Sequence, residues 1–169
     1  MTFGAAFQLG ITYGLLLSAV LTVLILGSLC INPEMWAHDA PPDIKARIGP
    51  ISERAKRQRT LFAFPFFGAL LAILVTALIQ LRTLAGGDLV FLPTLLMLYT
   101  MLMVFNLVDL LVIDWLIIET IRLKAFELPR LGDLAQVRHY GFHLRGFLIG
   151  SVGLLVMSLL IAVVAAWLF

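Results

Sequence analysis

Residues 6–31 read AFQLGITYGLLLSAVLTVLILGSLCI and contain no charged side chain. A helix of this length crosses the roughly 30 Å hydrocarbon core of a bilayer, even with some tilt. The run is preceded by no Lys or Arg, which a cleaved signal peptide would require. We therefore interpret it as a segment that is retained in the membrane. We expect it to be helical, because in lipid every backbone hydrogen bond must be made within the segment.

Three more uncharged runs follow, at residues 60–81, 89–108 and 146–169. The chain is 62% hydrophobic and 13% charged with a mean hydropathy of +1.05, whereas soluble domains carry roughly a quarter charged residues. We predict an all-α integral membrane protein that forms one membrane domain over residues 1–169. Its four transmembrane helices are expected at about 6–31, 60–82, 89–119 and 146–168.

The basic residues predict the orientation of this bundle. Every Lys and Arg except Arg82 lies in one of two connecting segments, 32–59 and 120–145. Because positive charge is retained on the inner side, both segments are expected in the cytoplasm and both termini outside, in a plasma or inner membrane. This placement accounts for the net charge of +2, and we predict no nucleic-acid partner.

An intramembrane polar site is predicted at Asn106, Asp109 and Asp114. If Trp115 marks the interface, Asp109 lies about 9 Å inside it. An ionised Asp at a helix centre costs roughly 2.5–3.5 kcal/mol, so Asp109 should face other helices or water, or be protonated. At about 100° per residue, Asp109 and Asp114 point about 140° apart, whereas Asn106 and Asp109 share a face.

Two interpretations of Asp109 remain open. It binds a proton or cation, or pairs with a base, within the membrane. Alternatively it makes an ordinary hydrogen bond between helices. The expected partners in that case are Thr76, Gln80, Tyr99 and Ser158.

A second candidate cluster lies at the predicted cytoplasmic interface. If helical, His139 and His143 share a face at a spacing compatible with metal binding. The chain has three histidines and one cysteine, however, so we predict neither metal nor cofactor and favour contacts with carboxylates or headgroups. The other candidates are His38, Asp39 and Glu119, which can converge with them only if segment 32–59 folds back over the end of the third helix. The HDAPPD run at 38–43 is either a ligand-bearing loop or a turn-rich connector.

Two further features predict contacts with lipid and between helices. Arg54, Lys56, Arg57 and Arg59 form a polybasic patch beside a membrane span, which is typical of binding to anionic headgroups. Small residues spaced by four allow close helix packing, either within the bundle or with a partner. They are Gly10 and Gly14, Gly68 and Ala72, and Gly146 and Gly150.

No motif specifies a reaction. The sequence favours a small transport-related or accessory subunit that uses Asn106 and Asp109, with a homo-oligomer or larger membrane complex as its expected context. The alternative is a membrane-embedded enzyme that acts on a lipid-like substrate at the cytoplasmic interface. A purely structural role has no positive sequence mark.

Overall fold

Four long helices dominate the computed structural model, which describes residues 2–128 and 131–168. Within those residues the chain forms helices and connecting segments, with no strand. The predicted all-helical fold is confirmed, and four stretches of the described residues are long and apolar enough to span a membrane. They are Phe3–Ile31, Glu53–Ala85, Phe91–Ile121 and Tyr140–Leu168.

The helices continue beyond the apolar runs from which they were predicted. Helix α3 (Glu53–Ala85) begins well before Thr60, because the side chain of Ser52 accepts a hydrogen bond from the backbone N–H of Ala55 and caps its first turn. It ends where Gly86 adopts a left-handed conformation, with φ of 86°. Polar residues can continue a helix outside the membrane because water satisfies their side chains.

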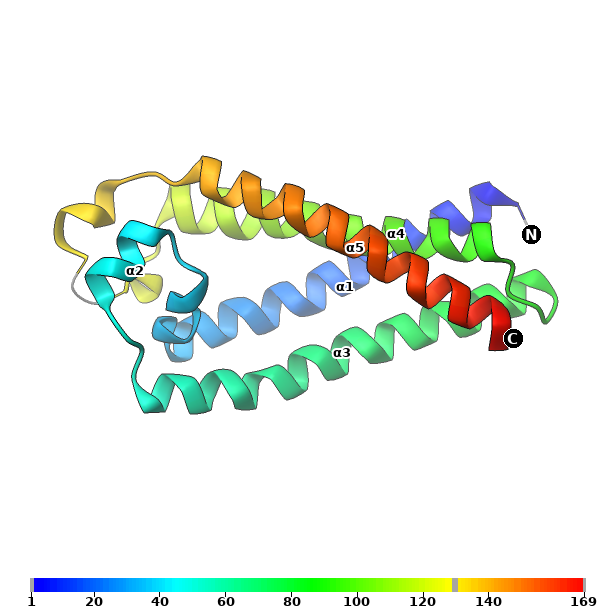
Figure 1. The fold of residues 1–169 in the computed structure, drawn as a ribbon, viewed down its shortest axis with the longest axis horizontal. Coiled ribbons are helices and arrows are strands. Elements are labelled where there is room, and N and C mark those ends of the chain that lie inside the picture. The colour runs from blue at the N-terminus through cyan, green and yellow to red at the C-terminus, as the bar shows by residue number, and fades with distance from the viewer. Residues whose placement is uncertain (1, 129–130, 169) are drawn as a thin grey trace.

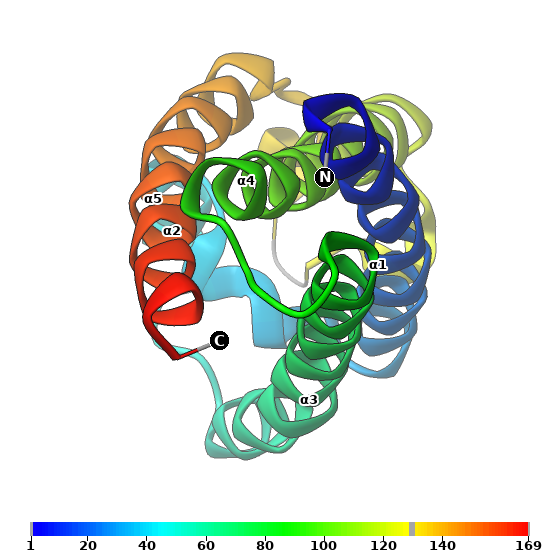
Figure 2. The same cartoon turned by 90° about the vertical axis from the view of Figure 1, so that its right-hand side faces the viewer.

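The helices lie side by side along the longest axis of the molecule (Figure 1). Helix α4 (Phe91–Val108) packs against α1 (Phe3–Ile31) and α5 (Tyr140–Leu168), and α3 packs mainly on α1. Viewed along the axis, the order around the bundle is α5, α4, α1 and α3 (Figure 2). Both termini lie at one end, and α2 (Pro42–Ile48) lies at the other (Figure 1).

Two glycines bring α1 and α4 into close contact. A Cβ atom added to Gly10 would lie 2.7 Å from the carbonyl oxygen of Met97, and one added to Gly14 would lie 2.7 Å from Cβ of Val104. This small-residue pair therefore serves packing within the bundle. By contrast, a Cβ atom on Gly68 or Gly146 would meet nothing within 4 Å.

The half of the bundle nearest the termini is filled by apolar side chains. Leu17 at its inner limit and Met97, Leu98 and Met101 are almost completely buried there and form one core with residues of α3 and α5. The opposite end, which we call the basic end, is built from the connecting segments 32–52 and 122–139. Its short helices are η1 (Pro33–Asp39), α2, η3 (Lys124–Phe126) and η4 (Gly132–Gln136).

Candidate functional site

Three acidic side chains line up along one helix at the basic end. After Val108 the chain continues as the π-helix η2 (Asp109–Ile121), in which residues five apart are hydrogen-bonded. The same spacing appears at its end, where the N–H of Arg122 donates to the carbonyl of Ile117 at 2.9 Å. Residues five apart therefore point in more similar directions than they would in an α-helix.

The acids of this helix follow that five-residue spacing. Asp109, Asp114 and Glu119 all line the same cavity. The prediction that Asp109 and Asp114 share no face was wrong, because it assumed an α-helix of about 3.6 residues per turn. The π-helix turns the three acids toward this one cavity, with Asp109 toward the membrane interior and Glu119 toward the basic end.

His143 on α5 bridges two of these acids. Its Nδ1 lies 3.0 Å from Oδ2 of Asp114, and its Nε2 lies 3.2 Å from Oε1 of Glu119. Ionised carboxylates accept hydrogen bonds but cannot donate them, so an imidazole that carries a proton on both nitrogens suits a position between two of them.

The trio is shielded to different degrees. The side chain of Glu119 is 5% exposed and that of His143 is 12% exposed, whereas Asp114 is 23% exposed. Glu119 is thus held inside the cluster, and Asp114 is the member most open to the cavity.

His139 connects this cluster to α2. Its backbone N–H donates to Oε2 of Glu119 at 3.0 Å, and its ring Nε2 lies 2.9 Å from Oδ2 of Asp43. That hydrogen bond lowers the pKa of the Asp43 carboxyl below its ordinary value of 3.8. A second link joins Arg47 to Asp133 at 3.1 Å. Segment 32–59 therefore folds back over the end of η2, which is the condition for convergence that the sequence left open.

Arg122 fastens the end of the π-helix. It adopts a left-handed conformation with φ of 54°, which costs a non-glycine residue about 1–3 kcal/mol. Its guanidinium donates to the carbonyls of Glu119 and Val137 and lies 3.5 Å from the Glu119 carboxylate. These contacts hold the strained turn and bring the segment before α5 against the cluster.

A cavity of about 530 Å³ opens beside the acids. Most of its wall is apolar, with contributions from α1, η1, η2 and α5. Its apolar wall includes Ile25, Leu29, Trp36, Ile113, Phe126 and Phe147. Its size and mixed lining are typical of a site for a small molecule.

Asp109 and Asn106 lie at the deep part of this cavity. The amide of Asn106 donates to the carbonyl of Phe147 at 3.2 Å and to Oγ of Ser151 at 3.1 Å, so it joins α4 to α5. Asp109 makes no hydrogen bond or ion pair with any residue that the structure describes. Of its expected helix partners, Gln80 instead accepts a hydrogen bond from Tyr13 at 2.6 Å.

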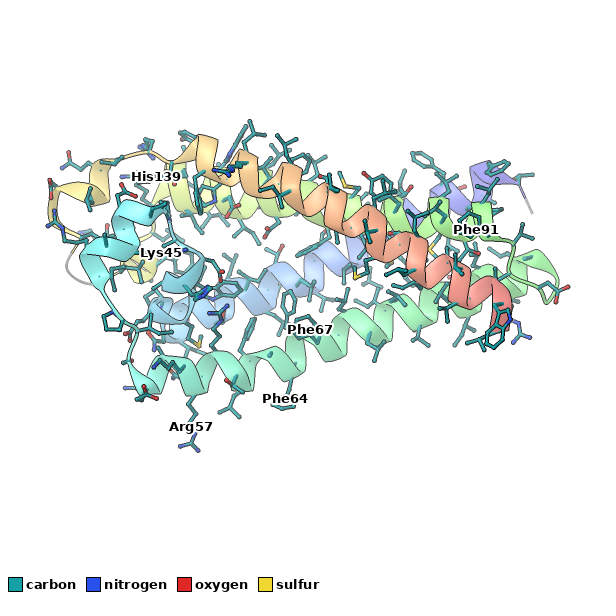
Figure 3. The ribbon with its side chains drawn as sticks, viewed as in Figure 1. Lys45, Arg57, Phe64, Phe67, Phe91 and His139 are labelled. Carbon is teal, nitrogen blue, oxygen red and sulfur yellow. The ribbon has the colours of Figure 1, made fainter. Side chains whose placement is uncertain are left out.

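Of the remaining predicted residues, Asp39 lines the cavity, whereas His38 and the polybasic patch do not. His38 is exposed and contacts its neighbour Asp39 at 3.3 Å, and Asp39 reaches both the cavity rim and Arg59 at 3.6 Å. In the polybasic patch, Lys56 pairs with Glu53 at 2.6 Å. Arg54 and Arg57 are exposed, and Figure 3 shows Arg57 pointing away from the bundle.

Two residues of this cluster, Asp43 and Arg122, were not among the site residues predicted from the sequence. Asp43 belongs to the HDAPPD run, whose acid and histidine content was the available signal. Figure 3 places His139 at the same end as Lys45, which lies on α2 with Asp43. Within residues 2–128 and 131–168, no group of three or more His, Cys, Asp or Glu is arranged to hold a metal ion.

Comparison with known proteins adds no assignment to this geometry. No family model matches the chain, and neither a curated protein nor a solved structure shows significant similarity to it.

Proposed function

We propose that this chain is a membrane-embedded enzyme whose cavity binds a lipid-like substrate and whose histidine–carboxylate cluster exchanges protons with it. The observation that carries the proposal is His143, which bridges Asp114 and Glu119 on the wall of an apolar cavity. Imidazole is the side chain that most readily gains and loses a proton near neutral pH. Carboxylates on both nitrogens fix its orientation and stabilise its charged form.

The degree of exposure suggests separate roles within the cluster. Asp114 is the most open of the three side chains and would exchange a proton with the substrate. His143 would pass a proton to or from Asp114, and buried Glu119 would hold the imidazole in place. His139 and Asp43 would stabilise the lid that α2 forms over the site.

The packing of the bundle supports an enzyme over a channel. The half of the bundle away from the cavity is closed by the buried core around Leu17, Leu98 and Met101. A solute would cross only if these close-packed side chains separated. A cavity that opens near one end suits a substrate that arrives from the membrane or the adjacent water.

A transport-related or accessory role is the second candidate, and Asp109 favours it. Its carboxylate faces the cavity from within a membrane-spanning helix and has no partner among the described residues. Such a group is suited to binding a proton or cation during coupled transport.

We further propose that the basic end faces the cytoplasm of a plasma or inner membrane. The exposed Arg54 and Arg57 would then contact anionic headgroups, at about 1 kcal/mol for each cation near the surface. In this proposed orientation the mouth of the cavity would lie at the level where polar headgroups meet acyl chains.

The test compares membrane lipids in the organism that encodes the chain. Its gene is deleted and complemented with the wild type, His143→Gln or Asp114→Asn, and total lipids are measured by mass spectrometry. We expect the deletion to change specific lipid species, the wild type to restore them and both variants to fail. The matched control is His38→Gln, which lies outside the cluster and should restore them fully.

An unchanged lipid profile on deletion would refute the proposed reaction. So would complementation by both cluster variants at membrane levels equal to the wild type, measured by immunoblot.

A further inference from the structure

The deep part of the cavity has a carboxylate for which the protein supplies no cation. Glu119 is contacted by Arg122 and His143, and Asp114 is contacted by His143. Arg122 and His143 are thus already paired with other acids. Asp109 is left facing the cavity with no partner among the residues that the structure describes.

This arrangement is electrostatically incomplete. An ionised Asp in the middle of a membrane helix costs roughly 2.5–3.5 kcal/mol. Lys45 also lines the cavity, but it is exposed and lines a second pocket beside Arg59 as well. A cation from outside the protein would offset the charge of an ionised Asp109.

Aromatic side chains provide a second, independent indication of the charge of the ligand. Trp36, Phe126, Phe142 and Phe147 all line the same cavity as Asp109. Aromatic faces attract organic cations, and the effect grows to about 2 kcal/mol or more when the cation is desolvated. Carboxylates combined with aromatic walls are the chemistry that recognises ammonium groups.

The size of the cavity distinguishes an organic cation from a metal ion. A volume of about 530 Å³ with mostly apolar walls exceeds the space needed by a single ion. The described residues also provide no cluster with metal-binding geometry.

From these observations we infer that the ligand of the cavity is an amphipathic ammonium compound, whose cationic nitrogen lies between Asp109 and the aromatic wall at Phe147 and whose apolar body lies against Trp36 and Phe126. The inference rests on the proposed function in taking the cavity as the substrate site, and it adds the chemical class of that substrate. An amine-bearing lipid has both parts.

The test uses the full chain in micelles of dodecyl maltoside, which carries neither a charge nor an ammonium group that could compete for the site. Trp115 and Trp167 are replaced by Phe, so that the remaining tryptophan, Trp36, reports on the cavity that it lines. The probes are octyltrimethylammonium, octylamine, octanol and octanoate, which share one chain and differ in charge. We expect the two cations to change Trp36 fluorescence saturably and to bind at least about tenfold more tightly than octanol, a factor that corresponds to 1.4 kcal/mol.

Asp109→Asn should weaken binding of both cations at least about tenfold and leave octanol unchanged. Asp88→Asn is the matched control, because Asp88 is exposed at the opposite end of the bundle, and it should bind all four probes like the wild type. If Asp109→Asn fails to fold, Asp109→Glu keeps the charge and should retain cation binding. Equal affinity for cations and octanol, or full cation binding by folded Asp109→Asn, would overturn the inference.

The outcomes separate this inference from the proposed reaction. Loss of cation selectivity with an intact lipid phenotype would remove only the substrate class. Selective cation binding that depends on Asp109, without a lipid phenotype on deletion, would leave an ammonium site and refute the reaction.

Discussion

The contact between α1 and α4 predicts a measurable cost for adding two methyl groups. In Gly10→Ala/Gly14→Ala, the new Cβ atoms would lie 2.7 Å from the carbonyl of Met97, 2.9 Å from that of Met101 and 2.7 Å from Cβ of Val104. Carbon atoms pack best at about 3.5–4.0 Å, so the helices must separate by roughly 1 Å. Overpacking of this kind costs about 1–3 kcal/mol per site.

Part of that cost is offset because Ala stabilises a helix by about 0.8–1.0 kcal/mol relative to Gly. We therefore expect the double variant to lose about 2 kcal/mol of unfolding free energy. The assay is reversible unfolding by sodium dodecyl sulfate in mixed micelles, followed by far-UV circular dichroism. The control is Gly68→Ala/Gly153→Ala, where an added Cβ meets nothing within 4 Å and only the helix effect remains. Equal stability of the two double variants would refute the packing argument.

Two further predictions concern the site. Asn106→Leu removes the hydrogen bonds to Phe147 and Ser151. Because hydrogen bonds between membrane helices contribute about 0.6 kcal/mol on average and about 1.7 kcal/mol at most, the variant should lose about 1 kcal/mol of unfolding free energy in the same titration. An unchanged unfolding free energy would show that the two bonds contribute nothing to stability. The lowered pKa of Asp43 means that its link to His139 is present above pH 3.8 and is lost as the pH falls through the lower native pKa. In the wild type, hydrogen exchange in α2, corrected for intrinsic rates, should therefore be slow at pH 5 and faster below pH 3.8. In His139→Gln the exchange should be fast at both pH values. Equal protection of α2 in the two proteins would contradict the link.

The sequence predicts the number and position of the spans because the cost of burying charge in lipid forces long uncharged runs. It does not predict how far each helix continues into water, where that cost disappears. Helix α3 begins at Glu53 because Ser52 caps it, and α5 extends to Tyr140. Hydrogen bonds of the helix ends, rather than hydropathy, determine these boundaries.

The candidate site was only partly predictable. The sequence identified His139, His143 and Glu119 as neighbours at one interface, but their pairing depends on contacts across long stretches of chain. Asp43 and His139 come from different connecting segments, and no local pattern links them. His38 resembles the other two histidines in sequence context, yet η1 leaves it exposed beside Asp39.

The π-helix is the feature that hydropathy could not reveal, although one signal was present. Apolar residues fill both sides of η2, so their periodicity does not distinguish an α-helix from a π-helix. The five-residue spacing of Asp109, Asp114 and Glu119 matches the i→i+5 hydrogen bonds of a π-helix. Spacing between acids is thus more informative here than spacing between apolar residues.

The change of helix type divides the third span into two parts with different roles. As an α-helix it packs tightly on α1 at Gly10 and Gly14, which closes the bundle near the termini. The π-helix then begins at Asp109, beside Asn106 at the deep part of the cavity. π-Helical turns are rare and frequently lie at functional sites. In this protein the π-helix carries three acids that line one cavity, and it ends at Arg122 in a left-handed conformation, so the change of helix type coincides with the change from packed core to polar cavity.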